Sequence, residues 1–260
     1  MSVIAIISDT HIGSSTALST PQFEIHTGRK DETQIAQATK AQEWLYACWV
    51  DYWNYVYALA CDGKKRKQHR IITICLGDVI DGNHHGTNQI MHEVQDQITL
   101  ALDLLRPVRD MSDRFYGILG TEGHAGNNND SEHGIYKALE CDEYAHQLTL
   151  NVDGTIIDAA HHSTLASLPA MYKIIADYEN LQRPRYIVRG HRHLVSDTGE
   201  EDRSTRMIVC SSWQLKTSFA WRVDQRRRAD IGGLIINNGV IDASRLRYMA
   251  SPDERRVISV

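Results

Sequence analysis

The sequence predicts an α/β fold of layered strands and helices. Short apolar runs of strand length alternate with longer amphipathic segments through roughly the first 190 residues, and such alternation is typical of α/β layers. Five of these runs end directly in Asp, Glu or His. Beyond Ser204 the helical pattern gives way to short strands with Gly and Asn turns, which predicts a β-rich closing portion over 204–260.

Length and composition indicate one globular unit. A chain of 260 residues with 42% hydrophobic and 23% charged residues can bury a sizeable core, so we expect a single domain over 1–260 rather than a disordered chain. The formal charge of -5 gives no overall attraction for nucleic acid. Binding of that kind would depend on the basic runs Lys64–Lys67 or Arg226–Arg228, although short charge runs are usually solvated loops.

The cysteine content and the hydropathy of the chain indicate its cellular compartment. The five cysteines are widely spread and form no CxxC pair, so we expect buried free thiols and no thiolate metal site. No run approaches the ~18 apolar residues of a membrane helix, and the N-terminus lacks a signal-peptide pattern. We therefore expect a cytoplasmic protein with no membrane partner.

The first half of the chain divides into strands and helices by its apolar spacing. Val3–Ile7 is an apolar run with the character of a buried strand. The polar segment 14–33 exceeds a usual connection, which predicts a loop over the site or a lid. Apolar residues recur at steps of three and four residues over 34–61, which predicts a helix there. We interpret its tryptophans as packing residues rather than as a platform on which bases stack. A strand at Ile71–Leu76 and an amphipathic helix ending near Pro107 follow.

The second half continues the alternation. The expected strands are Phe115–Leu119, Thr155–Ala160, Tyr186–Arg189, Met207–Cys210, Thr217–Val223 and Leu234–Ile241, and the expected helices are Glu132–Leu139 and Leu168–Tyr178.

Carboxylate and imidazole groups follow five of the predicted strands. They are Asp9 and His11, Asp78 and Asp81, Glu122 and His124, His161 and His162, and His191 and His193. The carboxyl ends of parallel strands lie side by side, so these groups are expected to converge there. A set of oxygen and nitrogen ligands without cysteine suits divalent ions such as Mn, Fe or Zn. A metal site is therefore predicted at the carboxyl ends of the strands.

The ordered set resembles the calcineurin-like metallophosphoesterase pattern of D-x-H, G-D-x-x-D, G-N-H-D/E, a later His and G-H-x-H. Four blocks stand in that order, as Asp9-Thr10-His11, Gly77-Asp78-Val79-Ile80-Asp81, His161 and Gly190-His191-Arg192-His193. The resemblance implies a layered β-sandwich flanked by helices, and two divalent ions with Mn favoured over Fe or Zn. Asp9, His11 and His193 would hold one ion, His161 and His191 the other, and Asp78 would bridge both. Asp81 would orient a ligand or the loop.

The third block departs from the family. Gly120-Thr121-Glu122-Gly123-His124 stands where Gly-Asn-His is usual, so the Asn that ligates the second metal in the family is missing. Glu122 or His124 could replace it, or His124 could protonate the leaving oxygen as a catalytic acid; we favour His124 as a site residue. This Gly-Thr-x-x-His variant is similar to one in phage-associated phosphoesterases, for which the compartment would be the host cytoplasm.

Two sets of residues have alternative interpretations. For Glu122, His124, His84 and His85, a role in an ordinary hydrogen bond within a loop is as plausible as a contact with substrate. His162 is the direct rival of His161, and the position immediately after the strand favours His161.

The resemblance implies two-metal hydrolysis of a phosphomonoester or phosphodiester. The basic runs favour a nucleotide or nucleic-acid substrate, whereas the net charge argues against tight nonspecific DNA binding. The alternative is a nucleic-acid-binding or assembly protein on a degenerate phosphoesterase fold, which the altered third block suggests. A hydrolase of the metallo-β-lactamase type is disfavoured because no H-x-H-x-D-H run occurs. Oligomeric state is left open.

Overall fold

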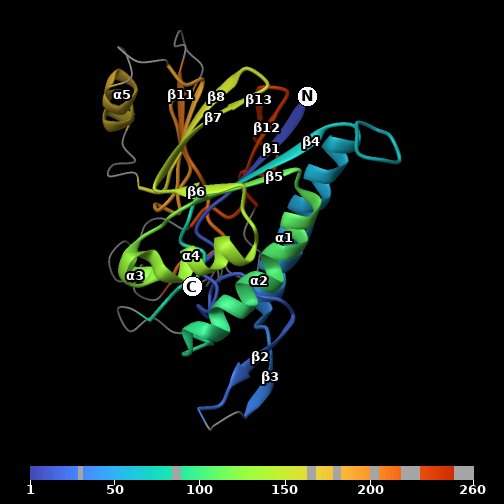
Figure 1. Ribbon diagram of the computed structural model, residues 1–260, viewed down its shortest axis with the longest axis vertical. Coiled ribbons are helices and arrows are strands. Elements are labelled where there is room, and N and C mark those ends of the chain that lie inside the picture. Colours follow the sequence, from blue (N-terminus) through green and yellow to red (C-terminus); the bar gives the residue numbers. More distant parts are fainter. Residues whose placement is uncertain are drawn as a thin grey trace, which may run out of the picture.

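Two β-sheets packed face to face, with helices on their outer faces, form the body of the fold, and a two-stranded sheet lies apart from them (Figure 1). The computed structural model describes residues 1–28, 32–83, 89–162, 168–177, 183–199, 205–217 and 229–248. The predicted layered α/β architecture, a β-sandwich flanked by helices, is confirmed.

The first sheet has the strand order β13-β12-β1-β4-β5-β6. Its strands are β1 (Ser2–Ile7), β4 (Arg70–Cys75), β5 (Arg114–Ile118), β6 (Glu143–Ala145), β12 (Leu234–Asn237) and β13 (Val240–Asp242). The four strands from β1 to β6 are parallel, with Ile6 opposite Ile74, and β12 runs antiparallel to β1. The carboxyl ends of β1, β4 and β5 therefore lie next to one another.

The second sheet has the order β10-β11-β9-β8-β7. Its strands are β7 (Gln147–Val152), β8 (Thr155–Ala160), β9 (Tyr186–Arg189), β10 (Ser196–Asp197) and β11 (Arg206–Val209). Strands β8, β9 and β11 are parallel, and β7 and β10 are antiparallel to their neighbours. The chain passes between the sheets at the junction of β6 and β7, so the five strands that precede the predicted site residues are divided between two sheets.

Alternation along β1 explains the layers. Ile4 and Ile6 point into the core between the two sheets, while Val3, Ala5 and Ile7 point into the core under the helices. This is the period of two expected for a strand buried on both faces. The helices over that second core are α1 (Lys40–Cys61), α2 (Val94–Met111) and α4 (Asp130–Ala138), and α5 (Leu168–Asp177) covers the second sheet through Met171. Two short helices, α3 (Glu122–Ala125) and η1 (Asn127–Asn129), lie between β5 and α4.

The start of the first helix was predicted wrongly. Thr39 is the N-cap and forms a reciprocal capping box with Gln42, so the helix begins at Lys40 and the preceding residues are free to be extended. They form β3 (Thr33–Gln37), which pairs with β2 (Gln22–His26). The interpretation of the helix tryptophans as packing residues is confirmed, because Trp49 is buried with its ring 4.9 Å from that of Trp213.

The hairpin of β2 and β3 occupies part of the segment expected to be a loop or lid. It projects from the body of the molecule at the bottom of Figure 1. His26 attaches it to α2: its backbone N–H donates to Asp96 Oδ2 at 2.8 Å, and its Nδ1 lies 2.5 Å from Asp96 Oδ1. The role of a lid stays a prediction.

Helix α2 continues past the residue at which it was expected to end. Pro107 lies inside the helix, which ends at Met111. Pro107 removes the hydrogen bond to the carbonyl of Asp103, but both residues are exposed, so that carbonyl can be solvated. Burial of Leu104, Leu105 and Val108 then outweighs the lost bond.

Three further expectations concern the rest of the chain. All five cysteines are free and four are buried, as predicted. The strand expected at Thr217–Val223 lies almost wholly outside the described residues. None of the helices in the described ranges has the length and apolarity needed to cross a membrane.

Candidate metal centre

The loops after β1, β4, β8 and β9 bring all six predicted metal ligands together. Asp9, His11, Asp78 and His161 are at most 2% exposed, and His191 and His193 are half-buried. Five of the six, Asp9, His11, Asp78, His191 and His193, have positive φ angles between 42° and 71°. Asp and His are among the non-glycine residues that tolerate this region best, and the conformation turns each chain sharply at the end of its strand.

The first ligand group is Asp9, His11 and His193. The Nε2 atoms of His11 and His193 lie 3.0 Å apart, and Asp9 Oδ1 lies 3.3 Å from His193 Nε2 and 3.7 Å from His11 Nε2. Atoms that bind one ion at about 2.0–2.2 Å are about 2.8–3.6 Å from each other. The donor set therefore fits a single divalent cation, with a small inward shift of Asp9 or His11.

The second group is Asp78, His161 and His191. His161 Nε2 lies 3.0 Å from Asp78 Oδ2 and 3.3 Å from His191 Nδ1, separations that again fit ligands of one ion. His161 Nδ1 lies 2.6 Å from the carbonyl oxygen of Leu76. That bond places the proton on Nδ1 and directs the Nε2 lone pair into the site.

Asp78 lies between the two groups. Its Oδ1 accepts hydrogen bonds from the backbone N–H and hydroxyl of Thr121, at 2.7 and 2.9 Å. Its Oδ2 faces three imidazoles, with His161 at 3.0 Å, His124 at 3.8 Å and His11 at 3.9 Å. One oxygen is thus fixed by the protein while the other faces both ligand groups.

Neighbouring groups orient Asp9 and His11. The backbone N–H of His191 lies 3.1 and 3.0 Å from the two carboxylate oxygens of Asp9, and the hydroxyl of Ser8 donates to the same carboxylate. Asp81 Oδ1 lies 3.5 Å from His11 Nδ1, the place of a carboxylate that orients a metal-binding imidazole.

The electrostatics of the centre favour positive charge. Burial alone would raise the pKa of Asp9 and Asp78, but hydrogen bonds and charge from neighbouring histidines lower both pKa values well below the usual range. Burial would lower the pKa of His11 and His161, yet the adjacent carboxylates raise these pKa values to about 10 and about 9. For His191, burial and the charge of His161 lower the pKa to about 4. Two buried carboxylates beside imidazoles form a site whose negative charge a cation can neutralise.

His124 joins the centre from the loop after β5. Its Nδ1 lies 2.8 Å from the backbone oxygen of Asp81, and its ring centroid is 4.4 Å from that of His11. The proton then resides on Nδ1, and Nε2 faces Asp78 Oδ2 at 3.8 Å. His11, Asp78 and His124 form a third group with ligand geometry.

The other candidates are placed less centrally. Glu122 is exposed at the first residue of α3 and belongs to none of the ligand groups formed by the described residues. His162 is exposed, with its ring 5.1 Å from that of His191. It therefore lies at the rim of the metal centre, whereas His161 lies inside the centre. His84 and His85 fall outside the described residues.

Sequence reasoning missed Glu132, a fully buried carboxylate behind Asp78. Its Oε1 accepts the N–H of Val79 at 3.0 Å and its Oε2 that of Gly120 at 2.5 Å. Burial and the charge of Asp78 raise its pKa to about 7. An acidic residue in the first turn of a helix ordinarily faces solvent, so no signal in the sequence distinguishes this one.

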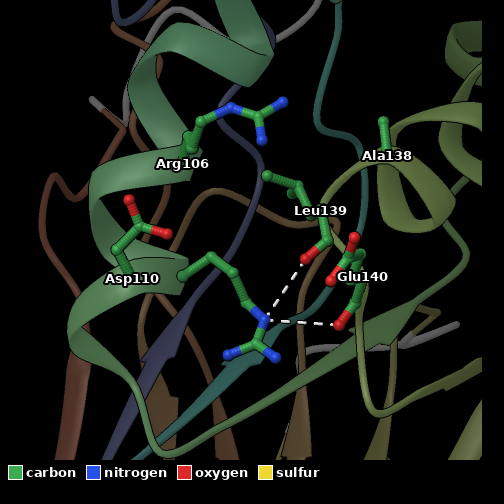
Figure 2. A pocket seen from close by; sticks show the side chains of 6 residues that line it. Arg106, Asp110, Ala138, Leu139 and Glu140 are labelled. Atoms are coloured by element: carbon green, nitrogen blue, oxygen red, sulfur yellow. Dashed lines mark hydrogen bonds between the residues drawn. The ribbon is translucent and has the colours of Figure 1, made fainter.

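A separate hollow of about 320 Å³ lies between α2 and the end of α4. Figure 2 shows Arg106 and Asp110 on one wall and Ala138, Leu139 and Glu140 on the other. Arg109 Nε donates to the carbonyl oxygens of Leu139 and Glu140 at 3.2 and 3.3 Å, bonds that satisfy groups at the end of α4. The hollow shares no residue with the metal centre.

Comparisons with known proteins find matches among solved structures at low sequence identity. Neither a family model nor a curated protein matches the sequence. A novel archaeal phosphodiesterase is 9% identical, with 91% of this chain and 93% of that chain covered and a TM-score of 0.43. Wild-type Vps29 from Entamoeba histolytica, complexed with Zn²⁺, is 10% identical over 92% and 87%, with a TM-score of 0.43. Yfce, a phosphoesterase from E. coli, is 11% identical over 91% and 88%, with a TM-score of 0.42.

Proposed function

We propose that this protein hydrolyses phosphate esters, either monoesters or diesters, with two divalent metal ions. The observation that carries the proposal is the position of Asp78 Oδ2, which faces His11 of one ligand group and His161 of the other. A carboxylate shared in this way could serve as a ligand to both ions of a two-metal site.

The six predicted ligands have separate tasks in this mechanism. Asp9, His11 and His193 would hold the first ion, His161 and His191 the second, and Asp78 would bridge them. The two ions, when bound, polarise the phosphoryl group and lower the pKa of the attacking water. The protein's own task is to keep the three ligands of each group directed at one point. The N–H groups of Thr121 and His191, which donate to Asp78 and Asp9, and the Leu76 carbonyl, which accepts from His161, support this orientation.

His124 is assigned the role of general acid. The carbonyl of Asp81 holds its Nδ1 proton, so the Nε2 atom is the one that can take up a second proton and deliver it to the departing oxygen. Its side chain is 18% exposed, which leaves it accessible to a substrate at the mouth of the site. Proton transfer by a positioned imidazole typically contributes about 10²–10⁴-fold to the rate.

The donor set supports a metal of the Mn, Fe or Zn class, and we favour Mn. Burial raises the pKa of Cys75 to about 12 and also raises that of Cys210, so both thiols stay protonated and are poor ligands. Nitrogen and carboxylate donors are then the relevant ones.

The identity of the ester is a matter of prediction. The basic run Lys64–Lys67 precedes the first residue of β4, whereas the metal centre follows its last residue, so the run lies at the opposite edge of the sheet. Lys67 is also paired with Asp113 at 2.6 Å. The run gives no support to a nucleic-acid substrate bound at the site, and a small nucleotide or another phosphodiester fits equally well. No feature of the described residues favours the alternative of a binding or assembly protein.

Metal content and turnover test the proposal together. Metal-depleted protein reconstituted with Mn²⁺ should bind two ions per chain and hydrolyse bis(p-nitrophenyl) phosphate or p-nitrophenyl phosphate. His193→Ala should lose the first ion and activity, while Asp130→Asn, an exposed acidic residue of α4, should behave as wild type. Two bound ions without turnover of either ester, or a single cysteine-ligated zinc, would contradict it.

A further inference from the structure

Glu132 connects the two loops that carry Asp78 and His124. It is the third residue of α4 and is fully buried. Its two carboxylate oxygens accept one N–H each, from Val79 at 3.0 Å and from Gly120 at 2.5 Å. Val79 immediately follows Asp78, and Gly120 immediately precedes Thr121. One side chain therefore spans the loop after β4 and the loop after β5.

The two loops are also in direct contact, which completes a closed set of bonds. Thr121 binds Asp78 Oδ1 through its N–H and its hydroxyl, at 2.7 and 2.9 Å. Gly120 leaves no room for a side chain, because an added Cβ would lie 2.3 Å from Asp78 Oδ1. Glu132 and the bonds between Thr121 and Asp78 thus hold the two loops together, and the rotamer of Asp78 depends on the distance between the loops.

We propose that Glu132 is a positioning residue for the second metal ion, one that fixes the Asp78 loop so that Oδ2 faces both ligand groups. This inference rests on the proposed two-metal function. The side chain must be a glutamate, because only a carboxylate offers two acceptors and the amide of Gln would present a donor to one of the two N–H groups. Asp at the same place is one methylene shorter and can reach one loop at most.

The effect should differ between the two ligand groups. Asp78 and His124 come from the loops that Glu132 connects, whereas Asp9, His11 and His193 come from the loops after β1 and β9. Because Asp78 would bridge both ions, loosening the contact at Glu132 should weaken both. The ion held by Asp78, His161 and His191 should be weakened more than the ion that Asp9, His11 and His193 also hold. A side chain needed only for folding would weaken both ions alike.

The experiment compares Glu132→Gln with Asp130→Asn, an exposed neighbour in the same first turn of α4. Mn²⁺ titration by calorimetry of Glu132→Gln should give a second Kd raised by about 10–100-fold, the range typical of groups that orient metal ligands. The Kd of the first ion should rise by a clearly smaller factor. Electron paramagnetic resonance at two Mn²⁺ per chain should show the loss of the spin-coupled pair signal. Asp130→Asn should match wild type in both measurements.

Thr121→Val provides a second test that leaves the buried carboxylate intact. It removes the hydroxyl bond to Asp78 Oδ1 and should weaken the second ion in the same selective way. Unchanged binding of both ions in Glu132→Gln overturns the proposal, as does equal weakening of both. If Glu132→Gln fails to fold by circular dichroism, Thr121→Val decides: selective weakening supports the proposal and wild-type binding overturns it. Wild-type protein that binds fewer than two ions contradicts the proposed function itself.

Discussion

Asp78 Oδ2 lies 3.0 Å from His161 Nε2, and both side chains are 1% exposed. A buried carboxylate in that position supplies negative charge to both ligand groups. Asp78→Asn keeps an oxygen for Thr121 but removes the charge, so activity should fall by at least about 10²–10³-fold, as when one electrostatic stabiliser is lost. Bound metal per chain, measured by elemental analysis, should fall as well. Near-normal turnover in this variant would disprove the bridging role.

His124 is tested by the leaving group of the substrate. If its Nε2 protonates the departing oxygen, His124→Ala should slow esters of high-pKa alcohols far more than nitrophenyl esters, because an activated oxygen leaves without a proton. If His124 is a ligand instead, metal occupancy falls and both kinds of ester slow equally. A leaving-group series and a metal assay on this variant separate the two roles. Unchanged rates with unchanged occupancy would mean that His124 takes no part.

Metal uptake should depend on pH in a defined direction. In the metal-free protein the pKa values of His11 and His161 are raised to about 10 and about 9, so both are protonated at neutral pH and must lose a proton to bind an ion. Mn²⁺ affinity should therefore rise with pH and level off near those values. Calorimetry in buffers of different ionisation enthalpy would count the protons released. Uptake that is independent of pH between 6 and 9 would contradict the expectation.

The same raised pKa values predict how the stability of the metal-free protein changes with pH. A histidine whose pKa is higher in the folded state contributes its full stabilisation when the pH is below its unfolded-state pKa of about 6.5. That contribution is lost as the pH rises through about 9 to 10. Thermal unfolding of the metal-free protein should thus shift to lower temperature from pH 6.5 to 10, while the metal-loaded protein changes less. A Tm that rises over this interval in the metal-free form would show that other groups dominate.

The hairpin contact gives a prediction that does not involve the metal. The hydrogen bond from His26 to Asp96, together with the charge of that carboxylate, raises the pKa of His26. The pair therefore favours the attached hairpin at low pH, and its contribution is lost as the pH rises through the folded-state pKa. Asp96→Asn should lower the His26 pKa in an NMR titration and speed amide exchange in β2 and β3. Asp103→Asn, an exposed change on the same helix, should alter neither.

The parts of the fold that sequence could predict are those set by local pattern. The apolar runs at Val3–Ile7 and Ile71–Leu76 are strands because they are buried on both faces, and their polar ends meet because parallel strands align. Pairing between distant strands has no such local signal. For this reason the assignment of β1, β4 and β5 to one sheet of the sandwich and of β8 and β9 to the other could not be foreseen.

Other features depended on tertiary context. The exposed hairpin has too little apolar alternation to separate it from a loop, and Pro107 is accepted in α2 because its missing bond faces solvent. Glu132 has the sequence context of an ordinary helix-start residue, and only the approach of two loops from elsewhere in the chain makes it a buried acceptor.

The positive φ angles of Asp9, His11, Asp78, His191 and His193 set a direction for the evolution of this chain. A left-handed conformation costs on the order of 1 kcal/mol for each non-glycine residue, and five of them together rival a good part of the net stability of a domain. Replacement of any of these ligands by glycine would relieve the backbone while it removes the donor. A descendant released from selection for the centre is therefore expected to gain stability as it accumulates glycine at these positions, so loss of the chemistry would be difficult to reverse.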